Sequence, residues 1–263
     1  VFANYSKGVQ VPGTDNLYNA FFFPTDSDAA NPVPETTDNF DLGYRVSTGQ
    51  VQAQVGVWYT IFNDRLASSF DPETERNVYR NLGRVDKYGI DASVSVRPIP
   101  EVAIYGFASY LKSDIKDNVQ NGVCTAAQVT GRLNLCTAVG GPAFALTAGK
   151  RESGSPTFTW GGRVQGELGP VELGMQIKRT GPRYVNDQNI PLVQTVNGVA
   201  NTVVYGAKTP SYTLVDLNAR VRLDWAGLGD KTYFQFNVSN VFDKLYVGGF
   251  DGQLADNSVP FVQ

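Results

Sequence analysis

The chain has 263 residues, is 42% hydrophobic, and carries 22 Lys plus Arg against 25 Asp plus Glu, for a formal charge of −3. This balance lacks the basic surplus that phosphate backbones attract, so nucleic acid is excluded as an expected partner. Histidine is absent, which removes histidine acid–base catalysis, Ser-His-Asp triads and imidazole metal ligands.

The composition favours strands over helices, since 27 Gly, 13 Tyr and 15 Phe suit extended segments joined by turns. Two charge-free runs, Leu133 to Gly149 and Gln188 to Ala207, are broken by Asn, Gln, Thr, Gly or Pro, so we expect loops there and no transmembrane helix. Val1 opens directly on a strand-like stretch without a secretory signal. We therefore expect the chain to begin inside a larger protein.

Nine strands are predicted, with long and tight connections in strict alternation. A soluble sandwich has no reason to place every long connection at one end, whereas an outer-membrane barrel has short periplasmic turns and long extracellular loops. The tight connections lie at Ser47, Pro98, Gly169-Pro170 and Ala226. The predicted strands are Val1–Lys7, Thr36–Val46, Val51–Asn63, Arg84–Arg97, Val102–Leu111, Pro156–Leu168, Val171–Thr180, Tyr212–Trp225 and Thr232–Asn240.

The strand Tyr212–Trp225 shows the alternation most clearly. Its even positions carry the polar residues Asp216, Asn218, Arg220, Arg222 and Asp224, and its odd positions form an unbroken apolar series. It is long enough for the roughly 9 to 11 residues that a tilted strand needs to cross a bilayer. Taken alone, this strand favours a soluble sheet with one face in water over a membrane barrel.

The same sorting recurs in the other strands, where Asp41, Arg45 and Lys178 all avoid the apolar parity. A bilayer imposes such exclusion, because Lys or Arg on a lipid-facing midplane site costs roughly 2 to 4 kcal/mol. The assignment of faces stays undecided for two strands. Val102–Leu111 is apolar on both parities, and Trp58 and Phe62 lie on the polar parity of Val51–Asn63. The predicted fold class is all-β, a fragment of a transmembrane antiparallel up-and-down β-barrel.

The only cysteines are Cys124 and Cys136, which lie in a predicted loop with eleven residues between them. A zinc site would need two further ligands nearby, so a loop disulfide is the better reading, with two free thiols as the alternative. The acidic loop at Asp71, Glu73 and Glu75 lacks the glycine and ligand spacing of an EF-hand. We expect no metal site, no cofactor and no catalytic residue.

Three stretches carry a resemblance: YSKGVQVPGTDNLY from Tyr5, PETTDNFDLGYR from Pro34 and SNVFDKLY from Ser239. Together they resemble the C-terminal half of the barrel of TonB-dependent outer-membrane receptors. The departures are Asn16, Gln10 and Asp41, where that family often has Glu, a basic residue and Glu.

The resemblance implies a location in the outer membrane of a Gram-negative bacterium and a barrel wall with lipid outside. Its implied partners are outer-membrane lipid, the protein's own N-terminal plug domain and TonB, and its implied function is energised uptake rather than catalysis. The plug, the first strands and the closing strand are expected to lie outside residues 1–263. The implied ligand is a small molecule such as a ferric siderophore.

Ligand contacts are expected from basic and aromatic loop residues, because Arg binds carboxylates in bidentate fashion and rings cover flat organic groups. The lumen-facing charges Asp216, Arg220, Arg222 and Asp224 are expected to form a structural ladder against the plug, and Asn218 is expected to share their face. The loop candidates are Tyr18, Phe21, Phe22, Phe23, Arg80, Arg84, Lys150, Arg151, Arg183 and Tyr184.

Two other classes of function remain open at this point. A passive porin or an autotransporter barrel would show the same alternation of side chains. A soluble β-sandwich adhesin or carbohydrate-binding domain would keep the strands without the asymmetry of the loops. The ligand also stays open among ferric siderophores, cobalamin, saccharides and other nutrients.

Overall fold

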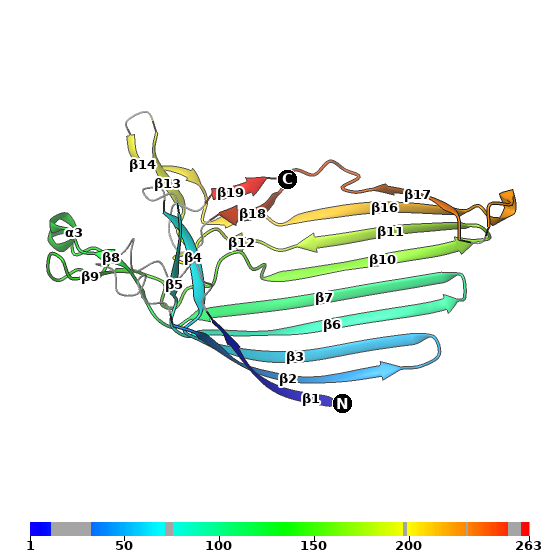
Figure 1. Ribbon diagram of the computed structural model, residues 1–263, viewed down its shortest axis with the longest axis horizontal. Helices are drawn as coiled ribbons and strands as arrows, with labels where there is room; N and C mark the ends of the chain where they lie inside the picture. Colours follow the sequence, from blue (N-terminus) through cyan, green and yellow to red (C-terminus); the bar gives the residue numbers. More distant parts are fainter. Residues whose placement is uncertain (12–32, 72–75, 197–198, 230, 252–258, 263) are drawn as a thin grey trace.

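The computed structural model describes residues 1–11, 33–71, 76–196, 199–229, 231–251 and 259–262. Nine strands form one antiparallel sheet in the order β1-β2-β3-β6-β7-β10-β11-β16-β17, so each strand pairs with the next long strand of the chain (Figure 1). They are β1 (Phe2–Gln10), β2 (Glu35–Ser47), β3 (Val51–Asn63), β6 (Val85–Ile99), β7 (Val102–Ile115), β10 (Phe158–Leu168), β11 (Val171–Thr180), β16 (Tyr212–Arg222) and β17 (Tyr233–Val238).

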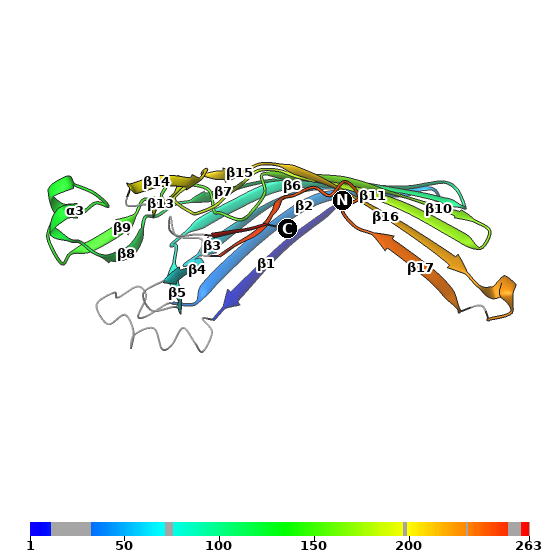
Figure 2. The same ribbon diagram turned by 90° about the horizontal axis from the view of Figure 1, so that it is seen from above.

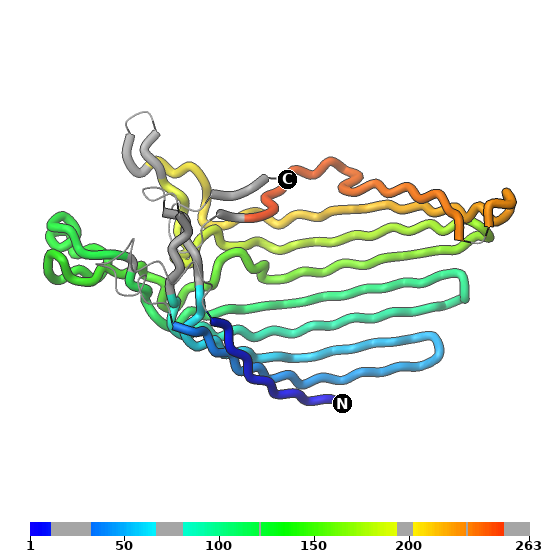
Figure 3. Tube along the Cα trace, in the orientation of Figure 1, coloured from blue at the N-terminus to red at the C-terminus, as the bar shows by residue number. Residues whose placement is uncertain are grey.

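The sheet is an arc with two different ends. The tight turns gather at one end and the long connections at the other, as the trace in Figure 3 makes plain. Seen from above, β1 and β17 curve toward the same side, as neighbouring strands do in a wall bent toward closure (Figure 2). The expected one-sided loop arrangement is confirmed.

Several strands differ in length from the sequence prediction. β7 continues to Ile115, four residues past Leu111, because the register from Val85↔Ile115 downward keeps it paired with β6 beyond the apolar stretch. β16 ends at Arg222, and a 3-10 turn (η2, Asp224–Ala226) follows, so Asp224 lies outside the strand that was expected to include it.

The long connections contain more structure than the loops expected from the sequence. Backbone groups in a protruding connection need partners, and strand pairing supplies them. The interpretation of 133–149 and 188–207 as plain loops is therefore corrected. The additional elements are β4 (Leu66–Asp71), β5 (Arg76–Asn81), β8 (Val119–Val123), α3 (Ala126–Gly131), β9 (Pro142–Ala145), β12 (Arg183–Tyr184), β13 (Leu192–Val196), β14 (Val199–Tyr205), β15 (Lys208–Thr209), β18 (Val247–Asp251) and β19 (Val259–Val262).

The register extends each face across the whole sheet, because directly paired residues point to the same side. Met175 pairs with Val164 and with Leu217, a continuous apolar row that we call the lipid face. The opposite side, which carries Gln176 and its partner Asp216, is the lumen face. Among the helices in the described part of the chain, none combines the length and apolar character that a membrane crossing requires.

Strand pairing decides the two assignments that the sequence left undecided, the faces of β7 and of Trp58. Ile104 pairs with Val164, so the even residues of β7 lie on the lipid face, and Tyr105 and Phe107 lie on the lumen face. Trp58 pairs with Asp41 and therefore also faces the lumen.

The apolar side chains of the sheet remain exposed, whereas the buried core lies among the connections. Leu42 and Met175 are 53% and 48% exposed on the lipid face. A soluble sandwich would cover that face with a second sheet, which is missing from the described residues. The buried cluster comprises Leu82, Val85, Ile115, Val119 and Ala145, with Phe62 packed against it.

Candidate functional site

The lumen face of the sheet is lined by aromatic rings that lie flat over glycines. A Cβ on Gly89 would stand 2.7 Å from the Trp58 ring, and one on Gly161 would stand 2.9 Å from the Phe107 ring. Since real Cβ atoms do not approach so closely, only glycine lets these rings lie along the wall. Rings that lie along the wall do not project into the lumen, and they make its surface partly apolar.

The charged lumen residues carry both signs and are bound mainly by neutral groups. Arg45 donates from Nε and Nη2 to Gln54 Oε1 at 2.9 and 2.7 Å, and Arg163 Nη2 lies 3.4 Å from Asn218 Oδ1. The Arg220 guanidinium stacks 3.8 Å from the centroid of the Tyr233 ring. Within the described residues, none of these three arginines forms an ion pair, so their charge is available to another group inside the lumen.

The predicted ladder on β16 has a narrower extent than expected. Asp216, Asn218, Arg220 and Arg222 share the lumen face, and Asp224 lies in η2 beyond the strand. Asp216 Oδ1 accepts a hydrogen bond from Asn240 N at 2.9 Å, and Arg222 Nη2 donates to the Gly169 carbonyl at 2.7 Å.

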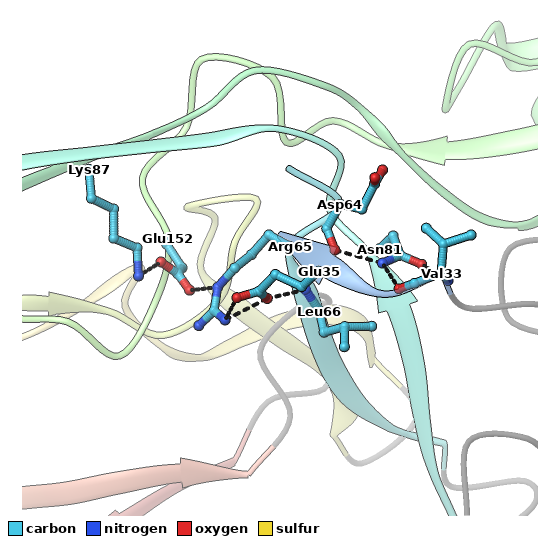
Figure 4. A network of polar contacts seen from close by, with 8 residues as sticks. All are labelled: Val33, Glu35, Asp64, Arg65, Leu66, Asn81, Lys87 and Glu152. Atoms are coloured by element: carbon cyan, nitrogen blue, oxygen red, sulfur yellow. Dashed lines mark hydrogen bonds and ion pairs between the residues drawn. The ribbon is translucent and has the colours of Figure 1, made fainter. Parts of the chain in front are cut away.

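A buried ionic network joins the connections where they leave the sheet (Figure 4). Arg65 lies between two carboxylates: its Nη1 is 2.8 Å from Glu35 Oε2 and its Nε is 3.1 Å from Glu152 Oε1. Lys87 Nζ pairs with Glu152 Oε2, and Glu35 Oε2 also accepts from Leu66 N at 2.9 Å. The side chains of Glu35 and Glu152 are 3% and 8% exposed. The network therefore fastens the two connections that carry Arg65 and Glu152 to the ends of β2 and β6.

The charges in this network support one another. Burial lowers the pKa of Arg65, but Glu152 and Glu35 outweigh burial and leave the pKa above its ordinary value. Phe62 contributes from β3, since Arg65 and Lys87 each lie 4.9 Å from the centroid of its ring. The guanidinium stays protonated at any physiological pH.

An aromatic row on the lipid face marks where the apolar surface ends. Tyr5 and Phe40 lie 5.1 Å apart between ring centroids, and Tyr59 and Tyr88 lie 6.2 Å apart, all in one register row. Tyr59 donates its hydroxyl to Asp86 at 2.7 Å, in the polar row above. Rings with one apolar side and one hydrogen-bonding tip suit a membrane interface.

The loop candidates separate into several environments. Arg183 is 8% exposed and donates to the carbonyls of Val247 and Gly248, so it supports β18. Arg84 pairs with Asp86 at 2.8 Å, and the Tyr184 ring lies 4.4 Å from Lys208 Nζ.

Lys150 and Arg151 belong to a segment that contacts β12, because Gly154 N donates to the Tyr184 carbonyl at 3.0 Å. Lys150 is exposed, and Arg151 Nη1 donates to Thr157 Oγ1 at 3.0 Å. Arg80 lies in β5, where only the backbone is described. Tyr18, Phe21, Phe22 and Phe23 lie outside the described residues.

The disulfide closes the arm formed by β8, α3 and β9. Cys124 and Cys136 are joined, with a Cα–Cα distance of 5.6 Å. Thr125 starts α3 through a capping box with Gln128, and Arg132 ends it in the left-handed conformation. Both cysteines are buried against Ala143 and Val129, so the arm has a small core of its own.

The sequence analysis missed the buried charges Glu35, Lys87, Glu152 and Asp187. Glu35 and Lys87 continue the lumen parity of β2 and β6 beyond the apolar stretch, a signal that was available. Their partner Arg65 lies in a connection, and no periodicity predicts which groups it meets.

The chain matches the family model described as "TonB dependent receptor-like, beta-barrel" over residues 1–241. Three solved structures are similar to it at low identity. They are the ferric yersiniabactin uptake receptor FyuA from Yersinia pestis (16% identity, TM-score 0.61), the ferric citrate transporter FecA (15%, 0.63) and the copper transporter OprC (15%, 0.60).

These likenesses cover 99%, 99% and 98% of the chain but 32%, 33% and 34% of the three structures. The chain thus spans about a third of the length of the proteins it resembles. No curated protein matches the sequence.

Proposed function

The chain belongs to the TonB-dependent receptor β-barrel family, and on that premise we propose that the whole protein takes up a scarce ligand with energy delivered through TonB. Proteins of this family lie in the outer membrane of Gram-negative bacteria and are transporters rather than enzymes. The location and the non-enzymatic class expected from the sequence are therefore confirmed.

The observation that carries the proposal is the lumen wall. Arg45, Arg163 and Arg220 face the lumen with neutral partners, and flat rings leave its width open. Arg45 and Arg163 are exposed and Arg220 is half-buried. Guanidinium groups bind carboxylates and carbonyls readily, so this wall suits a folded polar partner inside the barrel. We assign that place to a plug domain from another part of the protein, and residues 1–263 to the C-terminal portion of the barrel.

The ligand we propose is a ferric siderophore or a similar metal chelate. The likeness to FyuA and FecA supports iron, and the likeness to OprC leaves copper as the nearest competitor. Among the loop candidates, Lys150 is exposed and Arg151 lies beside it, where an anionic chelate would meet positive charge. Arg183 is assigned to structural support because its guanidinium already binds two carbonyls.

The test is uptake by cells that carry the complete receptor. Growth of a deletion strain on a panel of ferric chelates and copper sources identifies the ligand. Uptake of that ligand should stop when the proton gradient is collapsed or TonB is deleted, while binding at the cell surface persists. Uptake that continued and simply followed the external concentration would replace this proposal with a passive porin.

A further inference from the structure

Two of the long connections are fastened together by side chains that bind backbone groups. Asn189 Oδ1 accepts from Arg151 N at 2.9 Å, and Asn189 Nδ2 donates to Arg151 O at 2.8 Å. Two residues along each segment, Asp187 Oδ1 accepts from Ser153 N at 2.6 Å. Residues 151–153, between β7 and β10, are thereby joined to residues 187–189, between β11 and β16.

The Asp187 carboxyl lies fully buried against Ser153, where burial disfavours its ionised form. Asp187 is 0% exposed and Ser153 is 4% exposed. Asp187 Oδ2 and Ser153 Oγ are both buried, and neither has a hydrogen-bond partner among the described residues. A buried carboxylate with an unmet oxygen is costly, whereas a protonated carboxyl gains a hydroxyl that can serve as a donor.

The surrounding charges leave Asp187 without a cation of its own. Glu152 precedes Ser153, and both of its oxygens are taken by Arg65 and Lys87. Arg65 is shared further with Glu35, and the Arg151 side chain is directed at Thr157. No ion pair involves Asp187 within the described part of the chain.

Burial raises the pKa of Asp187 to about 7, against the opposing effects of the Ser153 backbone N–H and of the Ser153 side chain, both of which favour the ionised carboxylate. The Glu152 carboxylate acts in the same direction as burial, and Lys87 acts in the opposite one. The carboxyl therefore changes its charge within the range of pH that an outer surface meets.

We propose that Asp187 and Ser153 form a proton-dependent latch between these two connections, closed while the carboxyl is protonated and weakened when it ionises. Closing restricts the connections that carry Lys150, Arg151 and Tyr184. The effect of the latch on uptake rests on the proposed function, but the latch itself does not.

The direction of the pH dependence follows from linkage. An opened latch exposes Asp187 and returns its pKa to the ordinary value near 3.8, while the closed latch holds it at about 7. The open population therefore rises about tenfold per pH unit between these two values and levels off above the higher one.

The experiment measures hydrogen exchange in the complete receptor in detergent micelles, from pH 5 to 8, with rates corrected for intrinsic exchange. Peptides covering 150–157 and 183–190 should lose protection about tenfold per unit up to pH 7 and then level off. Asp187→Asn keeps the acceptor for Ser153 N and adds a permanent donor, so its profile should be flat. Asp64→Asn, the same chemical change at an exposed turn, should keep the wild-type profile.

Identical profiles for wild type and Asp187→Asn would overturn the latch. If Asp187→Asn did not assemble, the wild-type profile decides alone. Flat protection in both segments, with strand peptides as an internal reference, would rule the latch out. Because the readout is exchange and not uptake, a failure of the latch is distinct from a failure of the proposed transport function.

Discussion

The nine-stranded sheet and the assembly of connections above it place their apolar side chains in opposite ways. In the sheet, Val94 and Met175 are 42% and 48% exposed, and polar groups face inward. In the connections, Leu82 and Val119 are at most 2% exposed, as in a soluble protein. The sheet thus has apolar side chains facing lipid, whereas the connections bury theirs away from water. We expect a substitution to be costly in the sheet when it places a charge in lipid, and in the connections when it disturbs buried groups.

Placing a charge in the lipid face should have the largest effect. Met175→Arg puts a guanidinium near the middle of β11, where it costs up to about 4 kcal/mol. Gln176→Arg places the same group one residue away on the lumen face and should be tolerated. The measurement is the folded fraction after refolding into vesicles across a urea series. Equal losses for the two variants would contradict the assignment of the faces.

The connections should be most sensitive at their ionic network. Arg65→Met leaves Glu35 buried with one fewer cation, a change expected to cost at least about 3 kcal/mol. Arg84→Met removes an arginine whose side chain is 48% exposed, so less than about 1 kcal/mol is expected. Limited proteolysis of the connections, with the strands as reference, measures both. Comparable effects would show that the network does not hold the connections together.

Reducing the disulfide should loosen one arm and nothing else. Cys124 and Cys136 are separated by 12 positions, a closure worth ~2.9 kcal/mol in the chain-entropy model. Exchange in residues 119–145 should rise with a reductant while strand peptides stay protected. A variant with both cysteines replaced by Ala should no longer respond to the reductant. Free thiols in oxidised, periplasm-folded material would refute the pairing.

The smallest expected effect probes the packing of rings on the lumen wall. Gly89→Ala forces a Cβ to within 2.3 Å of the Tyr110 carbonyl and 2.7 Å of the Trp58 ring, which should cost about 1 to 3 kcal/mol. Gly166→Ala meets nothing within 4 Å and should stay within about 0.5 kcal/mol of wild type. Urea midpoints in vesicles compare the two variants. Indistinguishable midpoints would show that the ring moves aside without cost.

The sequence predicted those parts of the fold that a local period controls. Strand alternation has period two, so the nine strands and most faces followed from the residues within each strand. Trp58 escaped this rule because its ring lies over Gly89, a residue of a neighbouring strand. From the sequence of β3 alone, Trp58 is an apolar residue on the polar face, and the glycine that accommodates its ring belongs to another strand.

The connections resisted prediction because their contacts are long in sequence. Arg65 meets Glu152 across 87 positions and Glu35 across 30. Each of these residues, read alone, looks like an ordinary solvated loop charge. The additional hairpins were missed for the same reason, since pairs such as Val119↔Ala145 are separated by the whole arm.

The ionic network at the strand tops has a consequence for the direction in which the protein enters its membrane. Arg65 and Glu152 lie in connections that must cross to the outer side before they can pair with Glu35 and Lys87 at the ends of β2 and β6. Withdrawal would require dismantling this network and dragging its charges through about 30 Å of hydrocarbon. The network therefore opposes withdrawal of the strands through the membrane once its ion pairs have formed.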